Sequence, residues 1–252
     1  MEECKIKERE FVFLSGGNKL IGRLFEPEII EKDILLPSII ILHGWMLDNQ
    51  ESSFKFAREI SRKGFICMTF NYRGHSGSEG ILQEATRRDF FVDAINGYDF
   101  LTHQEHVDTN SITVIGSSLG GYLAILLSEE RKVRSLILKV PANAPDKFFD
   151  QKGTMYQSSE DIMSWRKTVH HHSESKSLRA LHNFTGSILL FYAGQDEALP
   201  HEVMNSYIKA VADVKQLTYV MFGQATHIMY KNPGIDRQIL NISVEWLMTI
   251  YK

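Results

Sequence analysis

Ser118 is the residue whose setting in this sequence best suits covalent chemistry. It stands at the centre of Gly116-Ser117-Ser118-Leu119-Gly120, which matches the pattern G-x-S-x-G. Alone this match is weak evidence, because short patterns of common residues also arise by chance. Its context is stronger, since the apolar run 111–115 predicts a strand before the motif and residues 119–127 predict a helix after it. A serine on such a sharp strand-to-helix turn is typical of a nucleophile that attacks an acyl carbon.

The small residues around Ser118 have a physical reason. Gly116 and Gly120 lack the side chains that would collide where a strand and a helix approach closely, and Gly121 extends this relief. Ser118 then lies at the helix N-terminus, where the helix dipole and the free N–H of Leu119 favour a developing oxyanion. The alternative interpretation is an inert serine in a tight turn.

Two further polar residues follow strand ends, in the chain order that suits such a nucleophile. Asp196 comes just after the predicted strand 187–192, and His227 comes after the predicted strand 217–222. Sites in open α/β sheets gather beyond the carboxyl ends of the strands. We therefore expect His227 to accept the Ser118 proton, while Asp196 orients the imidazole and stabilises its charged form.

Glu197 and His201 are alternatives that the sequence leaves open. Glu197 is one residue deeper in the loop than Asp196 and is a second candidate for the acid. His201 is a second candidate for the base, although it begins a predicted helix very soon after Asp196.

The segment His43-Gly44-Trp45 follows the predicted strand 38–42. Folds with this kind of nucleophile take a second oxyanion donor from the backbone at such a strand end. We expect the N–H of Trp45 to be that donor, together with the N–H of Leu119. Gly44 lets the backbone come close, and we interpret His43 as a structural hydrogen-bonding residue rather than as a base.

The elements that must position these residues alternate along the chain. Apolar runs predict strands at 11–14, 19–25, 38–42, 65–70, 111–115, 133–140, 187–192 and 217–222. Helical spacing of apolar residues predicts helices at 51–63, 85–101, 119–127, 201–211 and 235–250. This alternation predicts a mostly parallel sheet covered by helices on both faces. The first two strands are separated only by Ser15-Gly16-Gly17-Asn18 and should form an antiparallel edge hairpin.

Residues 141–186 interrupt this rhythm. They contain prolines, many polar residues and only short helical patterns, which indicates an insertion that caps the strand ends. Its apolar side chains could form an acyl pocket, or could simply seal the cap onto the domain. They are Phe148, Phe149, Met155, Tyr156, Met163 and Trp165.

Composition limits the class of protein. The chain of 252 residues suits a single domain, 1–252, and its net charge of −3 argues against a nucleic-acid partner held by a general basic field. Cys67 reads as a small buried hydrophobe, and two cysteines make no disulfide framework. The N-terminus is charged, and the sequence has no apolar run of 18 residues. We therefore expect no signal peptide, no membrane-spanning segment and a cytoplasmic location.

Two polar stretches have plain interpretations. The segment 71–80 is glycine-rich but lacks a phosphate-loop pattern, so we interpret it as a structural loop beside the site. His170-His171-His172 has no accompanying cysteine or second cluster, and adjacent side chains cannot easily share one rigid coordination geometry. We interpret these histidines as a solvated cap loop and expect no metal and no cofactor.

Taken together, these motifs resemble the α/β-hydrolase superfamily, and most of all its compact esterase and serine-aminopeptidase-like branch. The matching pieces are His43-Gly44-Trp45, Asn71-Tyr72-Arg73-Gly74-His75-Ser76, Gly116 to Gly121, Gly194-Gln195-Asp196 and Ala225-Thr226-His227. The resemblance implies a triad of Ser118, Asp196 and His227, with oxyanion donors at Trp45 and Leu119. Ser117 departs from the pattern, because many relatives carry a larger residue or histidine there.

The expected function is carboxylic-ester hydrolysis on a small-molecule substrate, with a small to medium or aromatic acyl group. The same residues would also serve an aminopeptidase, a thioesterase or an acyltransferase. A non-catalytic binding scaffold is the third class, although such proteins usually lose a triad member. The sequence gives no oligomeric state.

Overall fold

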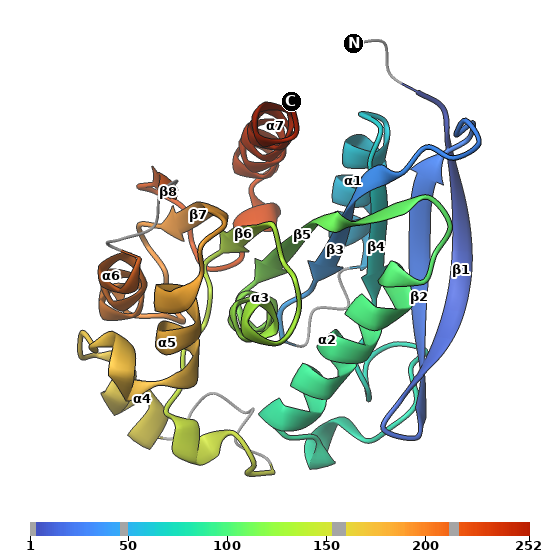
Figure 1. Ribbon diagram of the computed structural model, residues 1–252. Helices are drawn as coiled ribbons and strands as arrows, with labels where there is room; N and C mark the ends of the chain where they lie inside the picture. Colours follow the sequence, from blue (N-terminus) through green and yellow to red (C-terminus); the bar gives the residue numbers. More distant parts are fainter. Residues whose placement is uncertain (1–3, 46–49, 153–159, 212–216) are drawn as a thin grey trace.

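The structure is a computed structural model, and it describes residues 4–45, 50–152, 160–211 and 217–252. Figure 1 shows a twisted sheet with helices on both sides. The eight strands are β1 (Ile6–Ser15), β2 (Asn18–Pro27), β3 (Leu36–Leu42), β4 (Ile66–Phe70), β5 (Val107–Ser117), β6 (Ser135–Lys139), β7 (Ser187–Ala193) and β8 (Leu217–Phe222). Their order across the sheet is β1-β2-β4-β3-β5-β6-β7-β8.

Seven α-helices accompany these strands in the described residues. They are α1 (Gln50–Ser61), α2 (Arg87–Thr102), α3 (Leu119–Glu130), α4 (Glu160–Arg166), α5 (Lys176–Asn183), α6 (His201–Ala210) and α7 (Pro233–Ile250). The apolar residues of α1 and α7 belong to one core, and those of α2, α3, α5 and α6 belong to the other. The two sets of helices therefore cover opposite faces of the sheet.

The predicted architecture is confirmed. All neighbouring pairs from β4 to β8 are parallel, whereas β2 pairs antiparallel with both β1 and β4. The β1–β2 turn consists of Gly16 and Gly17, which have φ angles of 53° and 84°. Glycine tolerates these positive angles, which a two-residue hairpin turn between twisted strands favours.

Strand β3 shows why residues 39–42 are apolar without interruption. Ile40 and Leu42 point into the core beneath α2 and α3, while Ile39 and Ile41 point into the core beneath α1 and α7. A strand covered on both faces needs apolar side chains at every position. Strand β5 is longer than predicted and begins at Val107, because polar residues at its start hid the strand pattern.

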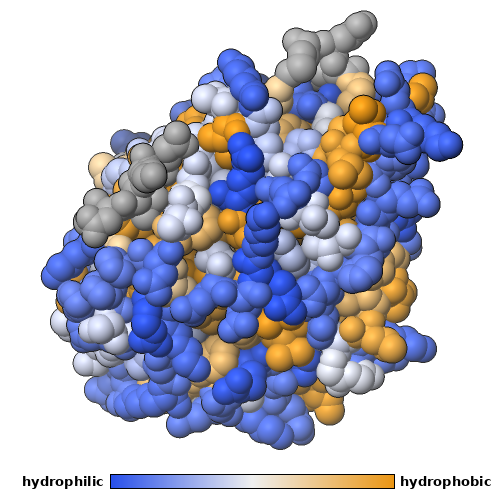
Figure 2. Space-filling view, viewed as in Figure 1, coloured by the Kyte–Doolittle hydropathy of each residue, from blue (hydrophilic) through white to orange (hydrophobic). Residues whose placement is uncertain are grey.

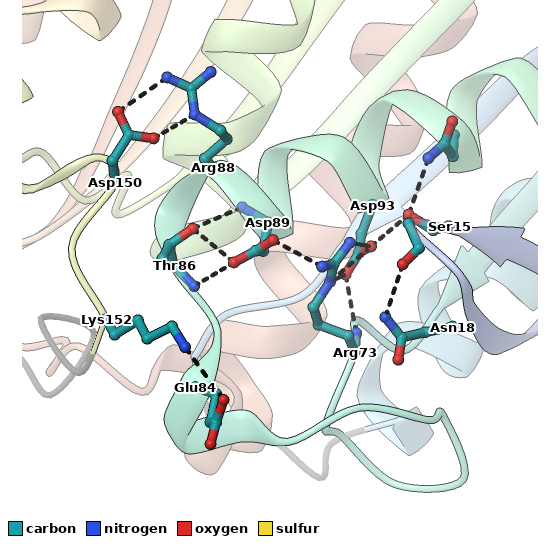
Figure 3. A network of polar contacts seen from close by, with 12 residues as sticks. Ser15, Asn18, Arg73, Glu84, Thr86, Arg88, Asp89, Asp93, Asp150 and Lys152 are labelled. Carbon is teal, nitrogen blue, oxygen red and sulfur yellow. Dashed lines mark hydrogen bonds and ion pairs between the residues drawn. The ribbon is translucent and has the colours of Figure 1, made fainter.

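The loop 71–80 is held by a buried ion pair. The Arg73 guanidinium donates to both carboxylate oxygens of Asp93 on α2, at 2.7 to 3.2 Å, and to Asp89 at 2.8 Å. Asp93 is fully buried and also accepts the Ser15 hydroxyl at 2.5 Å. Figure 3 shows these side chains converging from the β1 end, the loop and α2. This network gives the loop a structural role, as the sequence suggested.

The surface is mixed in character. Figure 2 shows one face, on which hydrophilic residues predominate and apolar residues form separate small groups. On β1, Val12 and Leu14 are exposed while Phe11 and Phe13 are buried, which is the alternation of a strand with one wet face. Among the described helices, none combines the length and the apolar composition that crossing a bilayer requires.

Cys67 is fully buried in β4, as expected of a small hydrophobe. Burial raises the pKa of its thiol to about 12, so the thiol stays protonated at neutral pH. Cys4 and Cys67 are both free, in agreement with the absence of a disulfide framework.

Candidate active site

Ser118 occupies a strained turn between β5 and α3. Its backbone angles are φ 50° and ψ −114°, outside the regions that residues with a side chain favour. Its N–H donates to the Lys139 carbonyl at 2.9 Å, and its own carbonyl accepts from Ala142 at 2.9 Å and from Tyr122 at 3.1 Å. These bonds hold a conformation whose strain is of the order of 1–3 kcal/mol.

The glycines around this turn are required by close approach. A Cβ on Gly116 would collide with the backbone of Gly120, and a Cβ on Gly120 would collide with the Leu42 carbonyl. A Cβ on Gly121 would come within 2.8 Å of Pro141 Cβ. The glycines thus let α3 start directly against the ends of β3 and β5.

The three residues expected to act together lie in one chain of hydrogen bonds. Ser118 Oγ is 3.0 Å from His227 Nε2, and His227 Nδ1 is 2.8 Å from Asp196 Oδ2. A carboxylate only accepts, so Nδ1 carries the imidazole proton and Nε2 is free to accept from the serine hydroxyl. Ser118 is 5% exposed and the Asp196 side chain 2%, so this chain lies largely out of water.

Backbone groups fix the carboxylate. Asp196 Oδ1 accepts from the N–H groups of Ala198 and Leu199, at 2.9 and 2.8 Å. The Gln195 N–H donates to the Ala225 carbonyl at 2.9 Å, which ties the acid loop to the loop that carries His227. The acid can therefore rotate little, and its second oxygen is directed at the imidazole.

The alternative acid and base lie elsewhere. Glu197 accepts the backbone N–H of His227 at 2.9 Å rather than the ring N–H, so it holds the loop and not the imidazole. His201 is the first residue of α6, and its ring packs edge-on against the ring of Tyr192. In the described residues, neither side chain bonds to Ser118.

Trp45 and Leu119, the residues predicted to supply the oxyanion donors, both belong to the region around Ser118. Leu119 is the first residue of α3, and Trp45 lines the same pocket as Ser118. The role of their backbone N–H groups as oxyanion donors stays a prediction. His43 is buried, and its ring bonds to the Gly44 carbonyl at 2.7 Å and accepts from the Tyr72 N–H at 3.4 Å. These bonds agree with the structural role that the sequence indicated for it.

A cavity of about 120 Å³ opens at the serine. Besides Ser118 and His227, its walls include Trp45, Lys139 and Tyr230. Residues from the N-terminal part of α7 also line it. The pocket therefore lies toward the α7 side of the sheet.

The cap does not line this cavity in the described residues, so the suggestion that its aromatic side chains form the acyl pocket is wrong for those that can be placed. Phe148 and Phe149 are buried, and Phe149 packs against Phe91. Trp165 stacks on His170, with ring centroids 3.8 Å apart. These side chains seal the insertion instead. Two other members of the proposed set, at 155 and 156, lie outside the described residues.

The triple histidine is not one solvated loop. His170 is buried, with Nδ1 3.0 Å from Glu174 and Nε2 2.8 Å from the Trp165 carbonyl, whereas His171 is exposed. The solvated interpretation is therefore wrong for His170, because neighbouring cap residues satisfy both of its ring nitrogens. Within the described part of the chain, no group of three or more His, Cys, Asp or Glu side chains could hold a metal ion.

Sequence reasoning missed two charged residues of the pocket, Lys139 and Asp236. Lys139 ends β6, whose other residues are buried, and burial lowers the pKa of its ammonium to about 8. Asp236 lies in the first turn of α7 and pairs with Lys55 at 2.6 Å. A lysine at the carboxyl end of a buried strand was the available signal, since sites of this fold gather there.

Comparison with known proteins places the sequence. Residues 52–251 match the model of the prolyl oligopeptidase family. An Arabidopsis thaliana α/β hydrolase domain-containing protein, WAV2, is 30% identical over 238 residues, which cover 79% of this chain and 73% of that protein. An uncharacterized Mycobacterium tuberculosis protein is 22% identical over 184 residues, 73% of this chain. The chain spans only 61% of the length of that mycobacterial relative.

Solved structures share the fold at low sequence identity. Thermogutta terrifontis esterase 2, phosphorylated by paraoxon, has a TM-score of 0.75 at 14% identity, covering 96% of this chain and 94% of that one. The Butyrivibrio proteoclasticus protein Est1E, with ferulic acid bound, has a TM-score of 0.68 at 18% identity, covering 93% and 98%. These likenesses bear on the fold, whereas the family match covers most of the sequence. The chain therefore belongs to the prolyl oligopeptidase family of the α/β-hydrolase superfamily.

Proposed function

We propose that the protein is a serine hydrolase that cleaves carboxylic esters through an acyl-enzyme on Ser118. The observation that carries this proposal is the hydrogen-bond chain from Ser118 Oγ through His227 to Asp196, with distances of 3.0 and 2.8 Å. An unactivated serine is a weak nucleophile, and an adjacent imidazole held in the right tautomer removes its proton during attack.

The reaction follows from this geometry. Ser118 Oγ attacks the ester carbonyl carbon while His227 Nε2 takes the hydroxyl proton, and the carbonyl oxygen becomes an oxyanion beside the N–H groups of Leu119 and Trp45. The intermediate collapses, and the imidazolium gives its proton to the departing alkoxide. Water then attacks the acyl-enzyme with His227 again as base, releasing the carboxylic acid and restoring Ser118. Asp196 keeps the imidazole oriented throughout.

The pocket favours a small to medium acyl group. The cavity of about 120 Å³ beside Ser118 has room for a short acyl chain, which supports this proposal. Two structural neighbours support this choice, because one is phosphorylated by paraoxon and the other binds ferulic acid. An ester series of increasing acyl length should peak at short to medium chains, and a preference for long lipid chains alone would contradict this assignment.

Peptide-bond hydrolysis is the second candidate. It is favoured by one specific observation, the match of residues 52–251 to the prolyl oligopeptidase family. The same triad also serves thioester cleavage and acyl transfer. A panel of para-nitrophenyl esters, aminoacyl para-nitroanilides and acyl-thioesters separates these activities, and the ester proposal requires the highest kcat/KM on the esters.

Replacing the nucleophile tests the proposal. Ser118→Ala should lower ester turnover on the order of a million-fold if the three residues act as a unit. Ser128→Ala is a matched control on the same helix, since its hydroxyl donates to the Ile125 carbonyl at 2.7 Å and the residue does not line the cavity at Ser118. Near-wild-type hydrolysis of an activated short-chain ester by Ser118→Ala would reject the assignment.

A further inference from the structure

Lys139 lies directly beside the nucleophile. It ends β6, where it is the register partner of Ser117, and its carbonyl accepts the Ser118 N–H at 2.9 Å. Its side chain lines the same cavity as Ser118 and His227. A group that enters this cavity while attached to Ser118 is therefore within reach of the lysine.

The ammonium of Lys139 has no anionic partner among the described residues. The acidic side chain that shares the cavity is Asp236, and its Oδ2 already binds Lys55 Nζ at 2.6 Å. Lys139 Nζ lies instead over the ring of Phe56, 4.2 Å from its centroid. Among the described residues that line the cavity, Asp236 is thus already paired, and Lys139 makes no ion pair.

Such an arrangement is unfavourable for the protein alone. A desolvated ammonium without an ion pair is costly, and the contact with an aromatic face returns only a small part of that loss. The lowered pKa of Lys139, about 8, has the same cause, since burial disfavours the charged form and Asp236 opposes this only in part. At neutral pH most of the lysine is still charged, so the cavity offers a ready partner for an anion.

Lys139 is poorly placed to replace His227 as the base. Ser118 Oγ already has His227 Nε2 at 3.0 Å, and a protonated amine cannot accept the serine proton. In the hydrolysis proposed above, the alcohol departs while the acyl group stays on Ser118. The acyl group is therefore the part of the substrate that remains beside the lysine.

We propose that Lys139 binds a carboxylate on the acyl part of the substrate, so that the enzyme prefers half-esters of short dicarboxylic acids over neutral esters of the same length. This inference rests on the proposed esterase activity and names its substrate class. The ammonium donates to the free carboxylate, and this charge-assisted hydrogen bond holds the scissile carbonyl against Ser118. The chemistry of the reacting ester is unchanged.

The test compares matched substrates. Monoethyl succinate, glutarate and adipate are paired with ethyl butyrate, valerate and hexanoate, and ethanol release is measured at pH 7. Wild-type enzyme should give a kcat/KM about 10- to 100-fold higher for the best half-ester than for its neutral partner, as expected for a hydrogen bond between charged groups. The best chain length reports the reach from Ser118 to the ammonium.

The variants assign the effect to one side chain. Lys139→Met should remove the preference, mainly through KM of the half-ester, so that the ratio of kcat/KM between the half-ester and its neutral partner falls to about 1, because the charge-assisted bond is lost. Lys139→Arg should restore part of the preference. Lys176→Met is the matched control, since Lys176 also lies over a phenylalanine ring, that of Phe149 at 4.4 Å, but outside the cavity.

The outcomes separate this inference from the esterase proposal. If wild-type enzyme hydrolyses neutral esters through Ser118 but shows no preference for half-esters, or if Lys139→Met keeps that preference, the role of Lys139 is overturned and the esterase proposal stands. If neither class of ester is hydrolysed, the esterase proposal falls, and the role of Lys139 falls with it. Labelling of Ser118 by a fluorophosphonate shows that each variant retains a reactive site.

Discussion

Replacing Asp196 with asparagine isolates the role of the carboxylate. In the native site, Oδ1 accepts from the N–H groups of Ala198 and Leu199, at 2.9 and 2.8 Å. The amide oxygen of an asparagine must stay at this position, because only an acceptor satisfies both donors. The amide nitrogen then faces His227 Nδ1, which must lose its proton to accept from the amide. Nε2 becomes the protonated nitrogen and can no longer accept the Ser118 proton.

The expected loss is large and specific. An imidazole trapped in the wrong tautomer lowers kcat about 10⁴-fold, which corresponds to roughly 5.5 kcal/mol of transition-state stabilisation. The assay is hydrolysis of a short para-nitrophenyl ester at pH 7, with thermal unfolding measured in parallel to show that Asp196→Asn is folded. A folded Asp196→Asn enzyme with kcat within 10-fold of wild type would refute the reasoning about the tautomer.

Glu197→Gln is the matched control for that experiment. Its amide oxygen can still accept the backbone N–H of His227, which Glu197 accepts at 2.9 Å, and it makes no bond to the imidazole. We expect a kcat reduced by less than about 10-fold, since a single exposed hydrogen bond is weakened. Equal losses of kcat in both variants would contradict a specific role of Asp196 as the acid.

Three further predictions concern stability. Asp93→Asn removes the fully buried anionic partner of Arg73 and leaves the more exposed Asp89 as its ion pair, so it should lower the free energy of unfolding by about 3 kcal/mol in urea titrations; a loss below 1 kcal/mol would contradict the burial argument. Lys139→Met should raise the free energy of unfolding at pH 7 by up to roughly 3 kcal/mol, since burial lowers the pKa of this lysine from 10.5 to about 8. Between pH 8 and pH 10.5 the unfolded wild-type chain binds more protons than the folded one, so the free energy of unfolding of the wild type rises with pH. The advantage of Lys139→Met should therefore shrink over this range, and an advantage that grows with pH would contradict the prediction. Gly120→Ala should unfold readily or fail to fold, because its methyl group meets the Leu42 carbonyl, and a variant with wild-type melting temperature would show that α3 can shift.

Local patterns predicted much of the fold. The turn at Ser118 could be predicted because its signals, the glycines and the flanking apolar runs, all lie close to it in the sequence. Strand β3 could be predicted because burial on both faces favours the continuous apolar run at residues 39–42. The pairing of β2 with β4 was not readable, since it joins segments about 45 residues apart that carry no complementary local signal.

The charged wall of the pocket could not be predicted in the same way. Asp236 sits in the first turn of a helix, where an acidic residue is also a common stabilising feature, so its burial beside the site leaves no mark in the sequence. The aromatic cap residues suggested a pocket because composition alone does not distinguish lining from sealing. Phe149 fills the space between α2 and the cap instead. The single domain, the cytoplasmic location and the expectation of no cofactor stay predictions.

Covalent labelling of Ser118 tests the central claim most directly. Wild-type protein treated with a fluorophosphonate should gain one adduct, and peptide mass spectrometry should locate it on Ser118. His227→Ala should slow this labelling strongly, because the base that activates the hydroxyl is lost, whereas His201→Ala should leave its rate close to that of wild type. An enzyme that hydrolyses esters while its adduct lies on another residue, or while Ser118 stays unlabelled, would contradict the account.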